Sequence, residues 1–177
     1  MQKINDWENV QASSDFASLP AGGYIVVIRK VEDKVNQNGK TYLEIKCDIA
    51  EGDFKDMAVD NEKALRKMDA YYGGKANGLF KRFTESVENS NRNFKWNWDE
   101  SKLIGKVFGV VMYQEEYVKD GDIRIATKID YTTTTTVDKI RKGDFKLIPM
   151  KKLDPSIIPA TNDNGDVNYG NAEGLPF

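Results

Sequence analysis

The chain has 177 residues, of which 40% are hydrophobic and 11% aromatic, so it is long enough for one domain with a substantial core. It contains no histidine and one cysteine, which excludes imidazole bases, Ser-His and Cys-His nucleophile pairs, disulfide frameworks and His/Cys zinc sites. The net charge is −2, but residues 154–177 hold four acidic and no basic residues, so residues 1–153 carry +2.

The ends of the chain differ in composition from its middle. Residues 1–11 are polar and mixed in charge, unlike a signal peptide, and no apolar run approaches the roughly 18 residues of a membrane-spanning helix. We therefore expect a cytoplasmic protein with an N-terminal arm over residues 1–20. Residues 154–177 are rich in Pro, Asn, Asp and Gly, which predicts a disordered acidic tail behind a folded domain at 21–153.

Residues 22–50 have the pattern of a long β-hairpin. Residues 24–28 are β-branched or aromatic at both parities, which predicts a strand covered on both faces. An Asn/Gly turn at 36–39 leads into residues 41–50, where apolar and polar residues alternate. The parity expected to be buried consists of Leu43, Ile45, Cys47 and Ile49, and the solvent-facing parity carries Tyr42 and Lys46.

The rest of the chain suggests one more short strand, helices and a second hairpin. Residues 54–59 form a weak strand pattern, and apolar residues at helical spacing predict helices at about 60–72 and 77–88. Residues 106–117 and 123–131 flank an Asp-Gly turn, and the threonine run at 132–136 extends the second of these strands. Residues 137–142 form a short helical turn. This order predicts a mainly β (α+β) five-stranded OB-fold barrel with a helix between strands three and four.

Aromatic and basic side chains interleave along the predicted strands and in the cluster at 94–99. Single-strand binding needs flat rings on which bases stack and cations that follow the phosphates, and it needs no catalytic group. The candidate nucleic-acid-binding residues are Lys30, Tyr42, Lys46, Lys95, Trp96, Trp98, Tyr113, Tyr117, Arg124 and Lys128.

Two parts of the sequence resemble known single-stranded DNA-binding proteins. The acidic tail and its tip, Leu175-Pro176-Phe177, are similar to the tails of the bacterial proteins, which end in Ile-Pro-Phe, although this tail has fewer acids. The body resembles the OB-fold proteins of phage and prophage replication-recombination modules at residues 19–24, 79–83, 94–99 and 103–106. The resemblance implies a protein that protects single-stranded DNA during replication, recombination and repair in a bacterial host. It also implies that the tip recruits partner proteins.

We therefore expect a binding protein, not an enzyme, without metal or cofactor. Two alternatives remain open. Glu44 and Lys46 have the acidic-x-Lys spacing of metal-dependent nucleases, with Asp33 as a further carboxylate, but a chain with 31% charged residues repeats that spacing by chance. The aromatic residues also suit a protein–protein interaction module. The sequence is compatible with a homo-oligomer and leaves DNA-over-RNA preference open.

Overall fold

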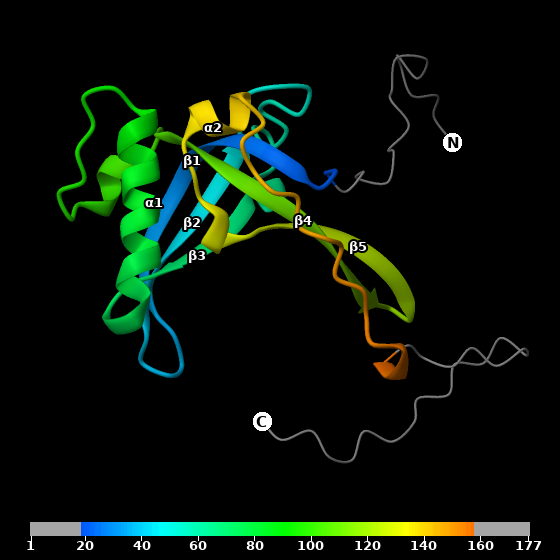
Figure 1. The fold of residues 1–177 in the computed structure, drawn as a ribbon. Helices are drawn as coiled ribbons and strands as arrows, with labels where there is room; N and C mark the ends of the chain where they lie inside the picture. Colours follow the sequence, from blue (N-terminus) through cyan, green and yellow to red (C-terminus); the bar gives the residue numbers. More distant parts are fainter. Residues whose placement is uncertain (1–18, 158–177) are drawn as a thin grey trace, which may run out of the picture.

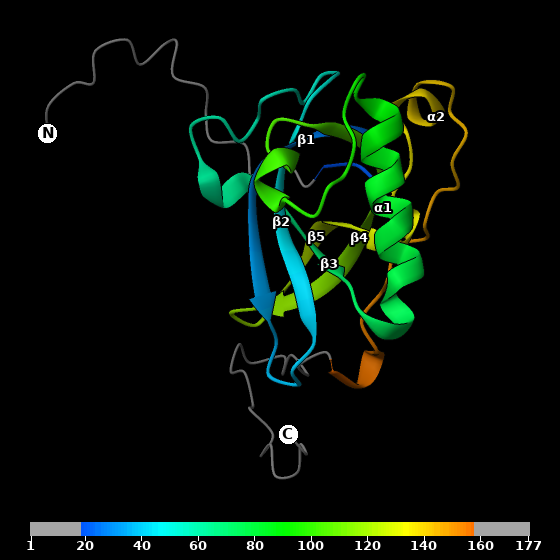
Figure 2. The ribbon, with the colours of Figure 1, turned by 90° about the vertical axis from the view of Figure 1, so that its left-hand side faces the viewer.

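The computed structural model describes residues 19–157, which fold as a mainly β protein. One antiparallel sheet has the strand order β3-β2-β1-β4-β5, and it curls until β3 and β5 come into contact, so the barrel is nearly closed (Figures 1 and 2). The strands are β1 (Gly22–Val35), β2 (Thr41–Ile49), β3 (Arg66–Tyr71), β4 (Val107–Lys119) and β5 (Asp122–Ile129). Helix α1 (Asn77–Ser90) lies between β3 and β4 in the chain, and the short helix α2 (Val137–Arg141) follows β5.

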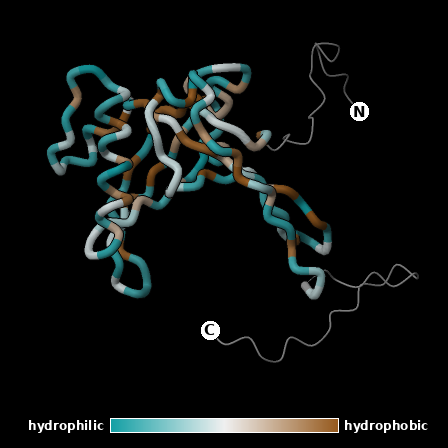
Figure 3. Tube along the Cα trace, in the orientation of Figure 1, coloured by the Kyte–Doolittle hydropathy of each residue, from teal (hydrophilic) through white to brown (hydrophobic). Residues whose placement is uncertain are grey.

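The core confirms the predicted hairpin. Residues 25–28 are buried on both faces of β1, and all four residues of the apolar parity of β2 are at most 4% exposed. Hydrophobic stretches follow the strands, whereas the loops are largely hydrophilic (Figure 3). Helix α1 closes one side of the barrel with Phe80, Phe83 and Val87, and the Phe83 ring meets the Phe108 ring edge-on at 5.4 Å. Burial also raises the pKa of the Cys47 thiol.

Two predicted elements were wrong. Residues 54–59 form turns and no strand, while residues 66–71, expected in a helix, form β3. Met68 fits a buried position in either periodicity, whereas Ala70 lies off the apolar stripe of the expected helix and is buried only by the alternation of a strand. The strand forms because Met68 pairs with Ile45 and Ala70 with Leu43 on β2, which buries both side chains. The same pairing gives the backbone N–H and C=O groups of the strand hydrogen-bond partners.

The threonine run does not extend β5, contrary to the prediction. Tyr131–Thr133 form a 3-10 turn, and Thr135 exchanges two 2.9 Å backbone hydrogen bonds with Gly109 of β4. Glycine is required at position 109, since a Cβ there would lie 2.5 Å from Ile140 Cγ1 and 2.8 Å from the Thr136 carbonyl oxygen. The helical turn at 137–142 is confirmed as α2.

The described residues end beyond both expected limits of the folded domain. Leu19 is fully buried, so the folded unit includes it, and the backbone around Lys151 hydrogen-bonds along β4. Residues 1–18 of the arm expected at 1–20, most of the acidic tail and the tip Leu175-Pro176-Phe177 lie outside the described residues. Within residues 19–157, no helix is both long and apolar enough to cross a membrane.

Candidate nucleic-acid interface

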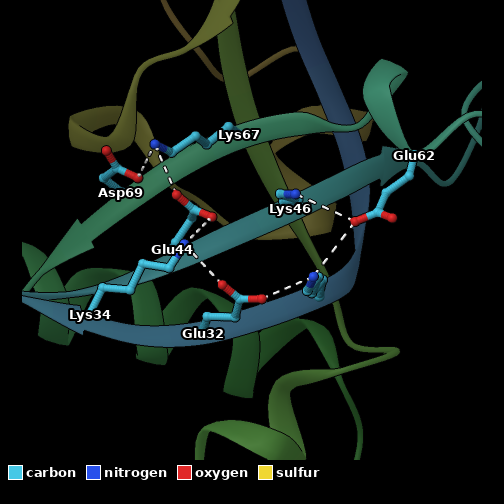
Figure 4. Close-up of polar contacts among 8 residues, drawn as sticks. Glu32, Lys34, Glu44, Lys46, Glu62, Lys67 and Asp69 are labelled. Carbon is cyan, nitrogen blue, oxygen red and sulfur yellow. Dashed lines mark hydrogen bonds and ion pairs between the residues drawn. The ribbon is translucent and has the colours of Figure 1, made fainter.

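Strand register places nine polar or aromatic side chains on the outer side of β1, β2 and β3. A bulge between Ile28 and Lys30 sets the register of β1, so Lys30 lies opposite Lys46. We call this group of nine side chains the sheet face, and Figure 4 shows charged members of it. Its three rows across β1, β2 and β3 are Lys30, Lys46 and Lys67, then Glu32, Glu44 and Asp69, and finally Lys34, Tyr42 and Tyr71. The predicted residues Lys30, Tyr42 and Lys46 therefore share one surface.

Glu44 is at the centre of the sheet face, and its side chain is only 12% exposed. Its carboxylate lies 2.7 Å from Lys34 Nζ and 3.0 Å from Lys67 Nζ, and hydrogen bonds from these ammonium groups lower its pKa. Glu32 accepts from Lys34 and Lys30, both at 2.9 Å, which lowers the pKa of Glu32 to about 2. The same contacts raise the pKa of Lys34, with the bond to Glu44 as the largest cause.

A further carboxylate comes from the turn that precedes β3. Glu62 Oε1 lies 3.4 Å from Lys46 Nζ and 3.7 Å from Lys30 Nζ (Figure 4). Lys67 Nζ also lies 3.4 Å from Asp69. The four lysines of this surface thus face four carboxylates, and the surface has no net charge. A phosphate at its centre has to displace a carboxylate from a lysine.

At the turn end of the sheet face lies a pair of rings, Tyr42 and Tyr71, and Tyr71 lines a hollow there. The Tyr42 and Tyr71 rings lie 5.1 Å apart at 30°. The hollow beside them, about 760 Å³, is lined by residues 36, 39–41 and 71–76, and we call it the rim hollow. Lys40 and Lys75 line it, and neither forms an ion pair within residues 19–157. Cations available to phosphate therefore stand beside a pair of aromatic rings.

Trp96 and Trp98 have different environments. Trp98 is 76% exposed, stacks on Phe80 at 6.2 Å and 26°, and has a φ of 66°, a strained conformation for a bulky residue. Trp96 packs against the core, and its indole nitrogen is buried without a partner in residues 19–157. Lys95 next to it pairs with Glu88 at 3.5 Å. Only Trp98 of this pair offers an open ring.

Tyr72 connects the two aromatic groups. It lines the rim hollow and also a cavity of about 90 Å³ beside Phe80, Trp96 and Trp98. Its hydroxyl donates to Asp33 at 2.7 Å, which fixes the ring between the two spaces. The Tyr42–Tyr71 pair, Tyr72 and Trp98 thus form a discontinuous row of rings around the end of the barrel.

The remaining predicted residues gather on the β4–β5 hairpin, which projects from the barrel (Figure 1). Tyr113 pairs with Lys128, and Tyr117 with Arg124, so these four share one face. Lys128 and Glu115 form an ion pair, and Arg124 lies 4.0 Å from Asp120. Lys151 Nζ covers the Tyr113 ring at 4.1 Å.

The hairpin and the sheet face meet at the seam between β3 and β5. A groove of about 370 Å³ runs there, and Lys67 and Lys128 line it from opposite strands. The ten predicted residues thus form three groups: one on the sheet face, one around Trp98 and one on the hairpin. All five predicted cations already have carboxylate partners, namely Lys30, Lys46, Lys95, Arg124 and Lys128.

Sequence reasoning missed several members of this surface because it assigned β3 to a helix. Lys67, Asp69 and Tyr71 alternate with Met68 and Ala70, which is the period-2 signal that would have placed them on a strand face. Lys34 and Tyr72 were missed for lack of a local signal, since only the register and the fold bring them to Glu44 and Trp98.

The arrangement proposed for a nuclease is not formed by the residues named for it. Asp33 pairs with Leu43, so it lies on the opposite face of the sheet from Glu44, and it accepts from Tyr72. Lys46 points to Glu62. Within residues 19–157, no group of three His, Cys, Asp or Glu side chains is placed to hold a metal ion.

Comparison with known proteins finds a sequence family that matches the part of the chain carrying the sheet face. Residues 5–87 match a family described as "Protein of unknown function (DUF669)". That segment contains β1, β2, β3 and most of α1, and hence the whole sheet face and rim hollow. No curated protein matches the chain.

Proposed function

We propose that this protein is an OB-fold protein that binds single-stranded DNA with little sequence preference. The observation that carries the proposal is the Tyr42–Tyr71 pair beside the rim hollow, together with Lys40 and Lys75 in the wall of that hollow, which form no ion pair within residues 19–157. Stacking rings next to available cations is the combination that single-strand binding requires.

The architecture supports the same proposal. Five antiparallel strands, with a helix between the third and the fourth, have the element order of an OB-fold. Such domains bind oligonucleotides over strands 2 and 3 and the loop between strands 1 and 2. Here those elements supply Tyr42, Tyr71 and Lys40.

The charges suggest how a strand lies on this surface. Because the centre of the sheet face is neutralised by its own carboxylates, phosphates bind at the rim hollow, and the bases stack on Tyr42 or Tyr71 and on Trp98. Stacking accepts every base, so sequence preference is small. The neutral centre keeps duplex DNA, with its dense phosphate charge, weakly bound.

The role in replication, recombination and repair rests on the resemblance of the tail. A partner protein takes the Phe177 ring in a small apolar pocket. Leu175 and Pro176 shape the approach, and upstream acids steer the tail to a basic partner surface.

The test is binding of the full-length chain to labelled single-stranded DNA, duplex DNA and RNA in the presence of Mg²⁺. We expect retention of single-stranded DNA without cleavage. Trp98→Ala and Tyr71→Ala should each weaken binding by about 1–3 kcal/mol, the contribution of one stacked base. Leu147→Ala is the control, because Leu147 is 66% exposed and lies outside the row of rings.

Other outcomes reject the proposal in distinguishable ways. Cleavage of the strand in Mg²⁺ favours the nuclease that uses Glu44 and Lys46. Failure to retain any nucleic acid favours a protein–protein interaction module. If Trp98→Ala and Tyr71→Ala both bind the strand as tightly as the original chain, the interface does not lie at the rim. Tyr117→Ala then tests whether it lies on the β4–β5 hairpin.

A further inference from the structure

A second polar pocket lies on another side of the barrel, between α1 and the segment that runs from the threonines through α2. Figure 2 shows this segment beside α1. The pocket, about 610 Å³, is lined by Arg82 on α1, residues 133–136, Lys139 on α2 and Lys146 beyond it, and we call it the threonine pocket. Its volume is within the range of small-ligand sites, about 300–1,000 Å³.

The cations of the threonine pocket lack carboxylate partners within residues 19–157. Arg82 donates to the Thr132 carbonyl oxygen at 2.7 Å, and it forms no ion pair in this part of the chain. Lys139 and Lys146 form none either among these residues. Of the two carboxylates in the lining, Glu85 lies 3.7 Å from Lys81, which is outside the pocket. The other carboxylate is that of Asp144. Because the lining has three cations and only two carboxylates, its net charge is positive.

Threonine hydroxyls provide the neutral part of the pocket. Thr133 donates to the Asp130 carbonyl oxygen at 2.8 Å, and Thr136 accepts from the Lys139 amide. Thr134 is 3% exposed, and its hydroxyl has no hydrogen-bond partner within residues 19–157. A buried hydroxyl without a partner costs stability.

We propose that the threonine pocket binds a phosphate group. A phosphate carries up to two negative charges and several acceptor oxygens, which suit three cations and nearby hydroxyl donors, and hydrogen bonds between such ions are the strong ones. The group belongs either to a free nucleotide or to the backbone of a DNA strand. The proposal does not rest on single-strand binding at the rim hollow, because no residue of that hollow lines this pocket.

The experiment measures the melting temperature of the full-length chain with sodium phosphate, thymidine monophosphate or thymidine, at constant ionic strength. We expect the two phosphate compounds to raise the melting temperature and thymidine to leave it unchanged. The double variant Lys139→Gln/Lys146→Gln should lose the effect, with affinity falling about tenfold or more for each cation removed. Lys142→Gln is the matched control, since Lys142 is an exposed lysine next to α2 that does not line the pocket.

Thr134→Val provides a second variant that keeps the shape of the side chain. It should fold at least as stably as the original chain, because it removes an unpaired buried hydroxyl, and it should bind phosphate more weakly. The proposal would be overturned if the phosphate compounds raised the melting temperature of the double variant as much as that of Lys142→Gln. It would also be overturned if neither the phosphate compounds nor a DNA strand raised the melting temperature of the original chain.

The source of the phosphate follows from a further arm with oligothymidine of increasing length. A response to thymidine monophosphate that does not grow with strand length identifies a nucleotide site. If the melting temperature rises only with longer strands, the site binds backbone phosphates. Lys139→Gln/Lys146→Gln should then remove this rise, and Tyr71→Ala should leave it. If strands fail to bind at the rim but thymidine monophosphate still binds here, the proposed function fails and this site remains.

Discussion

The sheet face and the threonine pocket both gather cationic side chains, but only on the sheet face are those charges neutralised. Each of its four lysines lies within 4 Å of a carboxylate, whereas the three cations of the threonine pocket have no such partner within residues 19–157. The number of lysines on a surface therefore does not measure its attraction for phosphate. The positions of the carboxylates decide it, and strand register sets those positions.

The largest effect we expect is on stability, at the centre of the sheet face. Glu44→Gln removes the charge that holds Lys34 and Lys67, and hydrogen bonds to charged groups contribute about 1.5–3 kcal/mol each. We expect the free energy of unfolding, measured in urea, to fall by about 1–3 kcal/mol, since an amide keeps part of the bonding.

Glu85→Gln is the control for that measurement. Glu85 is also paired with a lysine, Lys81, but its side chain is 55% exposed, and an exposed pair contributes at most about 1 kcal/mol. Equal decreases in the two variants would mean that the sheet face is no more tightly paired than an ordinary surface, which would remove the contrast with the threonine pocket.

The next effect is on the salt dependence of single-strand binding. Lys40→Ala/Lys75→Ala removes the two cations that line the rim hollow, so the slope of log affinity against log salt should fall by about 0.7 for each phosphate that the protein no longer neutralises. Lys46→Ala removes a cation that is already paired with Glu62, and we expect a smaller change. A slope that falls as much in Lys46→Ala as in the double variant would place phosphates on the centre of the sheet face.

The smallest effect we expect is on the pH dependence of stability. Lys34 and Lys67 hold the pKa of Glu44 below its usual 4.5, so the folded chain releases this proton more readily than the unfolded chain. The resulting stability is fully present above about pH 4.5 and is lost as the pH falls through the folded pKa. The difference in urea midpoint between the original chain and Glu44→Gln should therefore be constant from neutral pH to about pH 5 and shrink below it. A difference that widens on acidification would contradict this assignment.

Local patterns in the sequence predicted the strand segments in which every side chain, or every second side chain, is buried. The alternation of Leu43, Ile45 and Cys47 predicted β2, and the Asp-Gly turn at 120–121 predicted the second hairpin. The pattern failed at residues 64–72, where Ala64, Leu65, Met68, Tyr71 and Tyr72 also fit a helix. Pairing with β2, which depends on the whole fold, decides for the strand.

The candidate site was less predictable than the fold. The residue types were visible, but the bulge after Ile28 determines that Lys30 and Glu32 share a face with Lys46, and no local signal marks a bulge there. The ion pair of Lys46 with Glu62 depends in the same way on the turn before β3. Trp98 is exposed and has a positive φ, whereas Trp96, two residues earlier, is partly buried against the core, and no periodicity in the sequence distinguishes the two.

The pairing of β1 with both β2 and β4 has a consequence for how the chain folds. The β1–β2 and β4–β5 hairpins join neighbours in the sequence, whereas the pairs between Val26 and Phe108 or Val27 and Val107 close a loop that contains β2, β3 and α1. Local hairpins form fast and long-range pairing is slow, so we expect the β1–β4 junction to limit the folding rate. Destabilising substitutions at this junction, such as Phe108→Ala, would then slow refolding, and those near the tip of the β4–β5 hairpin would mainly speed unfolding.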